Sequence, residues 1–451
     1  MKKKYVRWTL WTIASPFILF IILCILIYLP PIQNFLVDKA AVYASEATGM
    51  NISVGRISLS FPLNLVVTNV DAASPHNDTL LSVRRLQVNV QLLPLLKKQV
   101  EVDGISLQGA TVNSNDLIHG MKLNGTLGEL FISSHGVALD PETAIVNKVL
   151  LKDTDLSLCL NDTAAADTAA SDTAYWKIIL QDIDLQNVSF ALDMPLDSLS
   201  LAASLDNAIL RDGLIDLHKS AYSLQTFRIE NGRVRYDNGK PLAADSLSSG
   251  LDPSHIALTD IGVKLDSLYY GGRNMKAIIS QFVLKERSGV EIVSATGRMV
   301  SNDKVLRVPS LKLETRDSYL ELNAAMDWNA LDFKDEGLVS ARLMADIGKP
   351  DVVRFMGSMD EKFIRQYPSE PLRIRTGIDG DLNKLKLTTL TAELPGALGL
   401  FARGELTHLT DSLLRGGDIT LEAETKDLKF VSTLAEGIEI PYGTRLEGKF
   451  T

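Results

Sequence analysis

Apolar and polar residues alternate with a period of two over most of this chain, and that alternation most restricts its fold. It begins after Met50 and returns in runs such as residues 63–70, 86–92 and 319–326. Successive side chains of a strand point to opposite faces, so these runs predict strands with one apolar face. Strand follows strand without a long helical period between them, which favours antiparallel pairing. The chain is therefore predicted to be mainly β, with few short helices.

Within several predicted strands the alternation changes phase at one small or polar residue. Ile52 and Val54 share one parity, whereas Ile57 and Leu59 take the other after Gly55. Such a phase change predicts a β-bulge or a tight bend. The pattern apolar-x-apolar-x-(Gly/Asp/Asn)-small-x-apolar recurs in copies that begin at Ile105, Val149, Ile183 and Phe227. Each copy predicts a strand, a bulge and a second strand piece, and together they favour a stacked supersecondary repeat.

The N-terminal residues predict a membrane anchor. Residues 8–29 carry no charge and follow a basic start that contains Lys2, Lys3, Lys4 and Arg7. At about 1.5 Å of rise per residue, this run spans about 33 Å as a helix, enough for one crossing. The run is longer than the core of a signal peptide and lacks a cleavage site just beyond it, which favours an uncleaved anchor over a cleaved signal. The predicted anchor residues are Trp8, Trp11, Phe17, Leu19, Ile22, Ile25, Tyr28 and Leu29.

The positive-inside rule places the basic N-terminus in the cytoplasm and exports everything after residue 31. We expect residues 1–31 to form the basic start and anchor, and residues 32–50 an amphipathic helix beside the membrane, with a plain linker helix as the alternative. Residues 51–159 and 175–451 are predicted as sheet. The small, acidic residues 160–174 between them cannot bury enough apolar surface to order, so they predict a disordered loop.

Later in the chain, helices are predicted at residues 351–367, ending before Pro368, and at residues 428–435. The chain stops at Thr451 within a strand pattern, so we expect a fragment of a longer protein.

The sequence offers no motif for catalysis, and no enzyme is predicted. A net charge of −9 and the lack of a basic patch argue against nucleic acid as a partner. The six histidines are scattered without metal-binding spacing, and no phosphate-binding glycine loop occurs, so no metal or cofactor site is predicted. Aspartates sit in turns and on exposed strand faces, which is where Asp is common. Cys24 lies in the predicted anchor, so Cys159 has no partner for an intramolecular disulfide.

One covalent modification is a hypothesis from the sequence. Several Asp-Ser/Thr-aliphatic tripeptides resemble the acceptor motif of a bacterial O-glycosylation system for exported proteins. Within the predicted disordered loop the candidate acceptors are Thr163, Thr168 and Thr173.

The order of features near the N-terminus resembles the AsmA-like/TamB family. A basic start and a single span precede a short helix ending in TGM at 48–50, and then come ISVGRI at 52–57, LQVNVQLLPLL at 86–96 and VDGISL at 102–107. The resemblance implies a protein anchored in the inner membrane, with its bulk in the periplasm. It also implies a long, curled antiparallel sheet, groove-like or taco-like, whose apolar lining carries phospholipid acyl chains toward the outer membrane. The family's C-terminal domain has no counterpart here, and through that missing region we expect an outer-membrane protein of the assembly-factor type as partner.

Two other interpretations stay open. The same alternation also builds a closed sandwich core, so ordinary core packing is an alternative for each apolar position. An anchored scaffold or chaperone for outer-membrane protein assembly or secretion would use the sheet edge instead of the groove. The candidate groove-lining residues are Ile105, Leu107, Val112, Ile183, Leu185, Phe190, Phe227, Ile229, Leu311, Leu313, Leu320 and Leu322.

Overall fold

A computed structural model describes residues 39, 41–42, 45–46, 49–60, 64–74, 78–90, 102–114, 120–138, 142–161, 176–239, 250–334, 337–356, 361–433 and 441–450. The chain divides into two compact units. Unit 1 is Met1–Ser171 with Ile183–Asp193, and unit 2 is Asp172–Asp182 with Met194–Thr451. The predicted anchor, most of the predicted helix at 32–50 and the three candidate acceptor threonines lie outside the described residues.

Unit 1 is an antiparallel sheet in which each strand pairs with the next in the chain. Its strands are β1 (Asn51–Ser60), β2 (Asn64–Ala73), β3 (Thr79–Val90), β4 (Val102–Asn113), β5 (Met121–Ala138) and β6 (Thr143–Leu160), with residues 183–193 of β7 (Lys177–Met194). Leu160 pairs with Met121 as the last residue of β6, so the strand runs one residue into the segment predicted as a loop.

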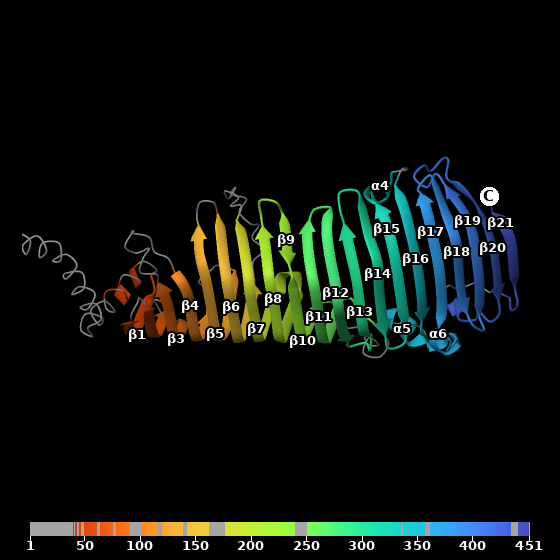
Figure 1. The fold of residues 1–451 in the computed structure, drawn as a ribbon. Helices are drawn as coiled ribbons and strands as arrows, with labels where there is room; N and C mark the ends of the chain where they lie inside the picture. The colour runs from red at the N-terminus through yellow and green to blue at the C-terminus, as the bar shows by residue number, and fades with distance from the viewer. Residues whose placement is uncertain are drawn as a thin grey trace, which may run out of the picture. The chain divides into compact units, whose positions relative to one another are not determined.

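Unit 2 is a second run of antiparallel strands, and Figure 1 shows them side by side in chain order. After the 3-10 turn η1 (Pro195–Asp197), its strands are β8 (Leu199–Asp216), β9 (Ala221–Leu224), β10 (Thr226–Asp237), β11 (His255–Gly271), β12 (Asn274–Glu286), β13 (Glu291–Ser301), β14 (Val305–Thr315), β15 (Tyr319–Asp327), β16 (Leu338–Ile347), β17 (Leu372–Asp381), β18 (Lys384–Leu394), β19 (Leu398–Thr407), β20 (Gly416–Thr425) and β21 (Arg445–Phe450). The prediction of a mainly β, antiparallel fold with few helices is confirmed.

The helices differ from their predictions. Residues 351–367 were predicted as one helix, but the structure has α5 (Lys349–Phe355) and α6 (Glu361–Gln366). The helix α5 ends at Phe355, with Met356 as its C-cap residue, so the predicted helix is not continuous. Over 428–435 the described residues hold only the 3-10 turn η2 (Val431–Thr433), and the short α4 (Trp328–Leu331) was not predicted.

The predicted bulges are confirmed, and in unit 1 they align. The fifth residue of each motif copy, Gly109, Asp153, Asn187 or Asn231, has a φ between 49° and 62°. Asn and Asp tolerate this left-handed conformation better than other residues with a Cβ, and Gly adopts it freely. In unit 1 the register of each strand pair has a gap at the same level, where two facing residues are not paired. The residues at these positions, here called the crease, are Gly55, Asn69, Arg84, Gly109, Gly128 and Asp153.

The crease leaves the register unchanged on its two sides, and the left-handed residues at it, Asn69, Gly109 and Asp153, lie on every second strand. Val54 pairs with Val70 on one side, and Arg56 pairs with Thr68 on the other, in the same register. An extra residue also reverses the parity of the strand that follows it. The apolar positions Val54 and Ile57, which are three residues apart in β1, therefore return to the same face of the sheet.

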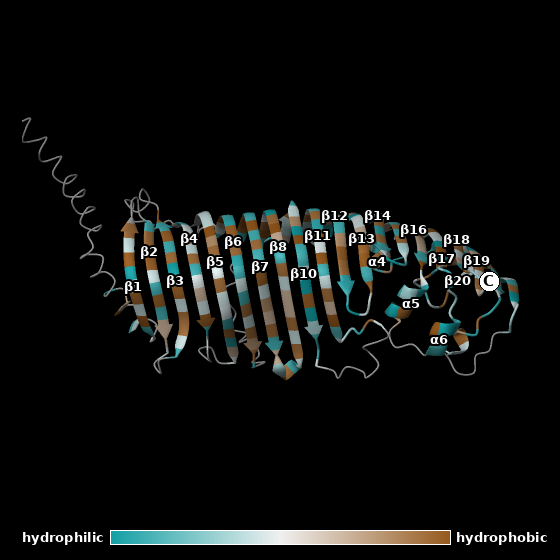
Figure 2. Cartoon of the chain, turned by 90° about the horizontal axis from the view of Figure 1, so that it is seen from below, coloured by the Kyte–Doolittle hydropathy of each residue, from teal (hydrophilic) through white to brown (hydrophobic). Residues whose placement is uncertain are grey.

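The buried apolar clusters of unit 2 lie at the ends of its last strands. One cluster joins α6 and η2 to the ends of β17, β18 and β19, and its aromatic members are Phe363, Tyr367 and Phe430. Their ring centroids lie 5.1–5.8 Å apart. A second cluster holds Ala330 of α4 against Val339 and Leu385. Figure 2 shows α5 and α6 beside the strands β17–β20.

We predict that Asn69→Val destabilises β1–β3, whereas Asn69→Gly does not. Asn69 has a φ of 53°, and a residue with a larger or branched side chain pays about 1–2 kcal/mol for this conformation. Hydrogen exchange of the β1–β3 amides measures the free energy of local opening in both variants. Equal protection in Asn69→Val and the wild type would show that the crease does not require the left-handed conformation.

We also predict a loss of stability at alkaline pH that depends on Tyr367. Tyr367 is 6% exposed, and burial raises the pKa of its phenol above the ordinary value. A group whose pKa is higher in the folded chain stabilises the fold below its unfolded pKa, about 10 for Tyr, and this contribution is lost as the pH rises through the folded pKa.

Thermal unfolding between pH 8 and pH 12 should therefore show a steeper alkaline decline in the wild type than in Tyr367→Phe. Every other tyrosine ionises in both proteins, so the difference isolates Tyr367. Parallel pH profiles would contradict the prediction.

Candidate functional site

Unit 1 carries two rows of aliphatic side chains across six strands. Directly opposed residues of an antiparallel pair lie on the same face of the sheet, so the register defines each row. One row is Leu59, Leu65, Val88, Ile105, Ile132 and Val149; the other is Ile57, Val67, Leu86, Leu107, Leu130 and Leu151. Every position of both rows is a Val, Ile or Leu, so this part of the face presents no polar side chain.

Unit 2, taken by itself, carries a similar pair of rows from β10 to β20. One row is Phe227, Leu265, Ile279, Gly297, Leu311, Leu322, Leu343, Thr376, Leu390, Ala402 and Leu421. The other is Ile229, Val263, Phe282, Ala295, Leu313, Leu320, Ala345, Ile374, Ala392, Leu400 and Ala423. Only Thr376 brings a polar atom into either row.

The larger side chains of these rows are half-buried, except Ile105, which is 37% exposed. The opposite face is mostly polar in unit 2, whereas in unit 1 it also carries Val66, Phe131 and Leu150. On β14, Leu311 and Leu313 are half-buried, whereas Lys312 and Glu314 are exposed. Lys312 lies opposite Glu321 on β15, with 3.9 Å between Nζ and Oε1. Figure 2 shows the alternation as brown and teal segments along single strands. Among the described residues, the larger side chains of the rows are thus partly open to solvent, whereas those of a sandwich core would be buried.

The structure places most of the predicted lining residues together. Leu311 and Leu313 of β14 lie opposite Leu322 and Leu320 of β15. Phe227 and Ile229 lie opposite Leu265 and Val263 of β11.

In unit 1 the predicted lining residues occupy both sides of the crease. Ile105 and Leu107 belong to the two rows, and Val112, beyond the crease, lies opposite Leu81. On β7, Ile183 and Leu185 are half-buried, and Phe190 is exposed.

The prediction missed other members of the rows, although the same alternation marks them. Leu86 and Val88 precede the first motif copy, and Leu130 and Ile132 fall between copies. In unit 2 the missed Ile279 and Phe282 stand three residues apart because a register shift separates them in β12. A search that followed alternation through a phase change would have found all of them.

The described residues contain no group of three or more His, Cys, Asp or Glu side chains arranged to hold a metal ion. Within the same part of the chain, no helix has both the length and the apolar character needed to cross a bilayer.

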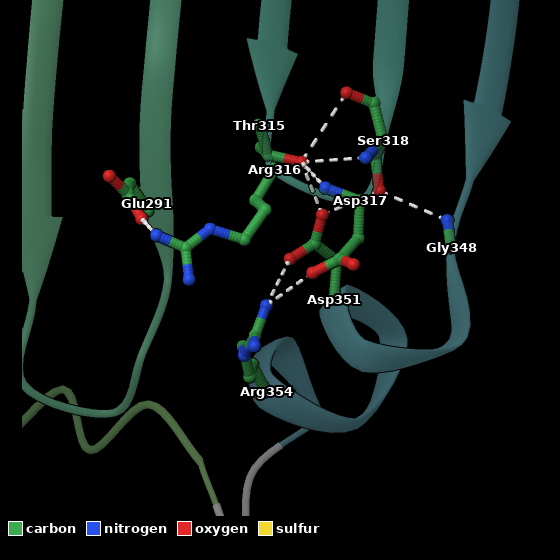
Figure 3. A network of polar contacts seen from close by, with 8 residues as sticks. All are labelled: Glu291, Thr315, Arg316, Asp317, Ser318, Gly348, Asp351 and Arg354. Atoms are coloured by element: carbon green, nitrogen blue, oxygen red, sulfur yellow. Dashed lines mark hydrogen bonds and ion pairs between the residues drawn. The ribbon is translucent and has the colours of Figure 1, made fainter.

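A buried polar network joins α5 to the turn between β14 and β15, and Figure 3 shows it in detail. Asp351 in the first turn of α5 is 1% exposed, and its Oδ2 accepts hydrogen bonds from the hydroxyls of Thr315 and Ser318. Its Oδ1 accepts from Nη1 of Arg354 at 3.1 Å. The Ser318 hydroxyl oxygen in turn accepts from the backbone N–H of Gly348, the residue before α5.

Arg354 extends the network to a second carboxylate. Its Nη1 lies 2.7 Å from Oδ2 of Asp317. Burial alone would lower the pKa of Arg354, but its hydrogen bonds to Asp317 and Asp351 outweigh that effect and raise the pKa. The guanidinium therefore stays charged, and both oxygens of Asp351 have partners. This network fixes α5 to the β14–β15 turn.

Asp351→Ala should release α5 from the β14–β15 turn and destabilise that region by about 2–4 kcal/mol, because it leaves Arg354 without one of its two carboxylates and removes the acceptor of the Thr315 and Ser318 hydroxyls. Hydrogen exchange at the backbone N–H groups of Asp317 and Ser318, which donate to Thr315 Oγ1, measures the effect. Glu361→Gln is the control, since its pair with Arg365 is highly exposed and should contribute little. Equal exchange in both variants would contradict the assigned role of the network.

The chain was compared with known proteins by family and by sequence. No protein-family model matches it, and no curated protein matches it either.

Proposed function

We propose that this chain is a lipid conduit, in which phospholipid acyl chains lie against the apolar sheet face and move along it. The observation that carries the proposal is the pair of apolar rows in each unit. Most of the row side chains are half-buried, and in unit 2 the opposite face is mostly polar. A phospholipid tail offers the matching surface, and each methylene group removed from water contributes about 0.8 kcal/mol.

The direction of the rows across the sheet suits transport of acyl chains as well as their binding. Rows cross the strands along the hydrogen-bonding direction, where neighbouring strands lie about 4.8 Å apart. In unit 1 every row position is a Val, Ile or Leu, and in the two rows of unit 2 only Thr376 is polar, so a tail can pass from one strand to the next over an almost entirely apolar surface. The sheet curled into a groove would shield the tail further, and the irregularity shared by the strands at the crease provides the bend.

The proposal includes a place in the cell envelope. Residues 8–29 anchor the chain in the inner membrane, residues after 31 lie in the periplasm, and lipid travels toward the outer membrane. The resemblance to the AsmA-like/TamB family supports this placement, as does the basic residue excess before residue 8. A C-terminal region beyond Thr451 would meet an outer-membrane protein of the assembly-factor type.

Photo-crosslinking tests the conduit with matched positions on the two faces. We expect a photoreactive amino acid at Leu107 or Leu313 to form phospholipid adducts in cells, since both belong to the apolar rows. The same amino acid at the neighbouring Ser106 or Lys312, on the opposite face, should form none. Mass spectrometry of the purified protein identifies the adducts.

Adducts to polypeptide alone at Leu107 and Leu313 would contradict the conduit and favour the scaffold or chaperone. Equal lipid labelling at all four positions would also contradict it, because it would show that contact with lipid does not depend on the face.

A further inference from the structure

One end of the apolar face in unit 2 is bordered by two adjacent turns. Ala221, the first residue of β9, pairs with Asp216 of β8 on one side and with Gly271 of β11 on the other. The turns that follow Asp216 and Gly271, residues 217–220 and 272–273, therefore lie side by side at the same end of the strands. Figure 1 shows this end of β8, β9 and β11.

Two stacked tyrosines stand just inside these turns. Tyr222 of β9 lies opposite Tyr270 of β11, with ring centroids 6.2 Å apart and an angle of 28° between the ring planes. Tyr222 is 40% exposed and Tyr270 is 46% exposed. Each ring is thus partly packed against the protein and partly open to a ligand.

The tyrosines end an apolar stretch of the sheet. Two residues further from the turns, Leu224 lies opposite Leu268, and both are half-buried. Residues two apart in a strand share a face, so Tyr222 and Tyr270 stand on the same face as these leucines. Tyr has an apolar ring and a polar hydroxyl, and for this reason it is favoured where apolar and aqueous surroundings meet.

Each of the two turns also carries a cation. Lys219 is exposed in the first turn, and the only carboxylate of that turn, Asp216, is buried and accepts the backbone N–H of Lys219 at 3.0 Å. The side chain of Arg273, in the second turn, is 48% exposed, and its Nη2 lies 3.1 Å from Oδ2 of Asp332. Its Cζ lies 5.2 Å from the centroid of the Trp328 ring. Lys219 and Arg273 thus lie in the turns that border the tyrosines, each three residues along the chain from Tyr222 or Tyr270. Cations and phenolic hydroxyls at the end of an apolar face are the groups that suit a phosphate attached to acyl chains.

We propose that Tyr222, Tyr270, Lys219 and Arg273 form a headgroup subsite for an anionic phospholipid whose tails lie against Leu224 and Leu268. The phenolic hydroxyls donate to phosphate oxygens, and the Lys219 ammonium pairs with the phosphate. The subsite rests on the proposed lipid conduit and adds to it a preferred headgroup charge and a fixed headgroup position.

The test measures binding of radiolabelled dioleoyl phosphatidylglycerol and of dioleoylglycerol, which has the same tails and no phosphate, to the purified full chain. Tyr222→Phe/Tyr270→Phe keeps the stacked rings and removes only the hydroxyls. We expect it to weaken phosphatidylglycerol binding about tenfold, the effect of losing about 1.4 kcal/mol of hydrogen bonding, and to leave dioleoylglycerol binding unchanged.

Tyr269→Phe is the matched control. Tyr269 is 41% exposed and adjacent in sequence, but it lies opposite Ser223 and Lys276 on the other face. It should leave the binding of both lipids unchanged.

Unchanged phosphatidylglycerol binding in the double variant would overturn the subsite and leave the conduit standing. If the double variant lost binding of phosphatidylglycerol and of dioleoylglycerol to the same extent, the subsite would also be overturned. The same holds if Tyr269→Phe weakened phosphatidylglycerol binding as much as the double variant. Full competition by inorganic phosphate alone would overturn the assignment to a lipid headgroup. A wild-type chain that binds neither lipid would overturn the conduit together with the subsite.

Discussion

Backbone hydrogen bonding between strands that follow one another in the chain is the interaction on which each unit depends. It fixes which residues stand opposite each other, and the opposed apolar residues then form rows on one face. The well-buried apolar clusters of unit 2 are small and lie at strand ends. Cross-strand contacts worth about 0.2–1 kcal/mol each, repeated along many strand pairs, must therefore contribute much of the stability.

The aligned irregularities follow from the same constraint. A bulge in one strand alone would shift its register and turn part of its apolar set to water. In unit 1 the six strands share the irregularity at the same level, so Val83 and Arg85 keep the same register toward β4 on the two sides of Arg84. Shared bulges can bend the strands without breaking up the apolar face.

Much of the fold could be predicted because strand alternation and left-handed bulge residues are local features. Asp153 and Asn187 were predicted at bulges from their place in an eight-residue pattern, and the structure gives them φ values of 49° and 52°. Contacts between distant segments could not be predicted in this way. Asp351 meets Thr315 only because the β14–β15 turn and α5 reach the same strand end. Tyr222 meets Tyr270 only because the short β9 pairs with β11. Both contacts depend on how segments far apart in the sequence are brought together. The alternation of apolar and polar residues within a strand does not determine that arrangement.

The consecutive pairing in unit 2 has a consequence for how such a protein can change in length. In the part of the chain that the structure describes, each strand from β12 to β20 pairs with the strand before it and the strand after it. Duplicating one hairpin would thus lengthen the apolar track by about 10 Å, two strand spacings, while every other pairing stayed intact. An architecture of this kind can be matched to the distance it must cover by adding or deleting hairpins, with no new core to design.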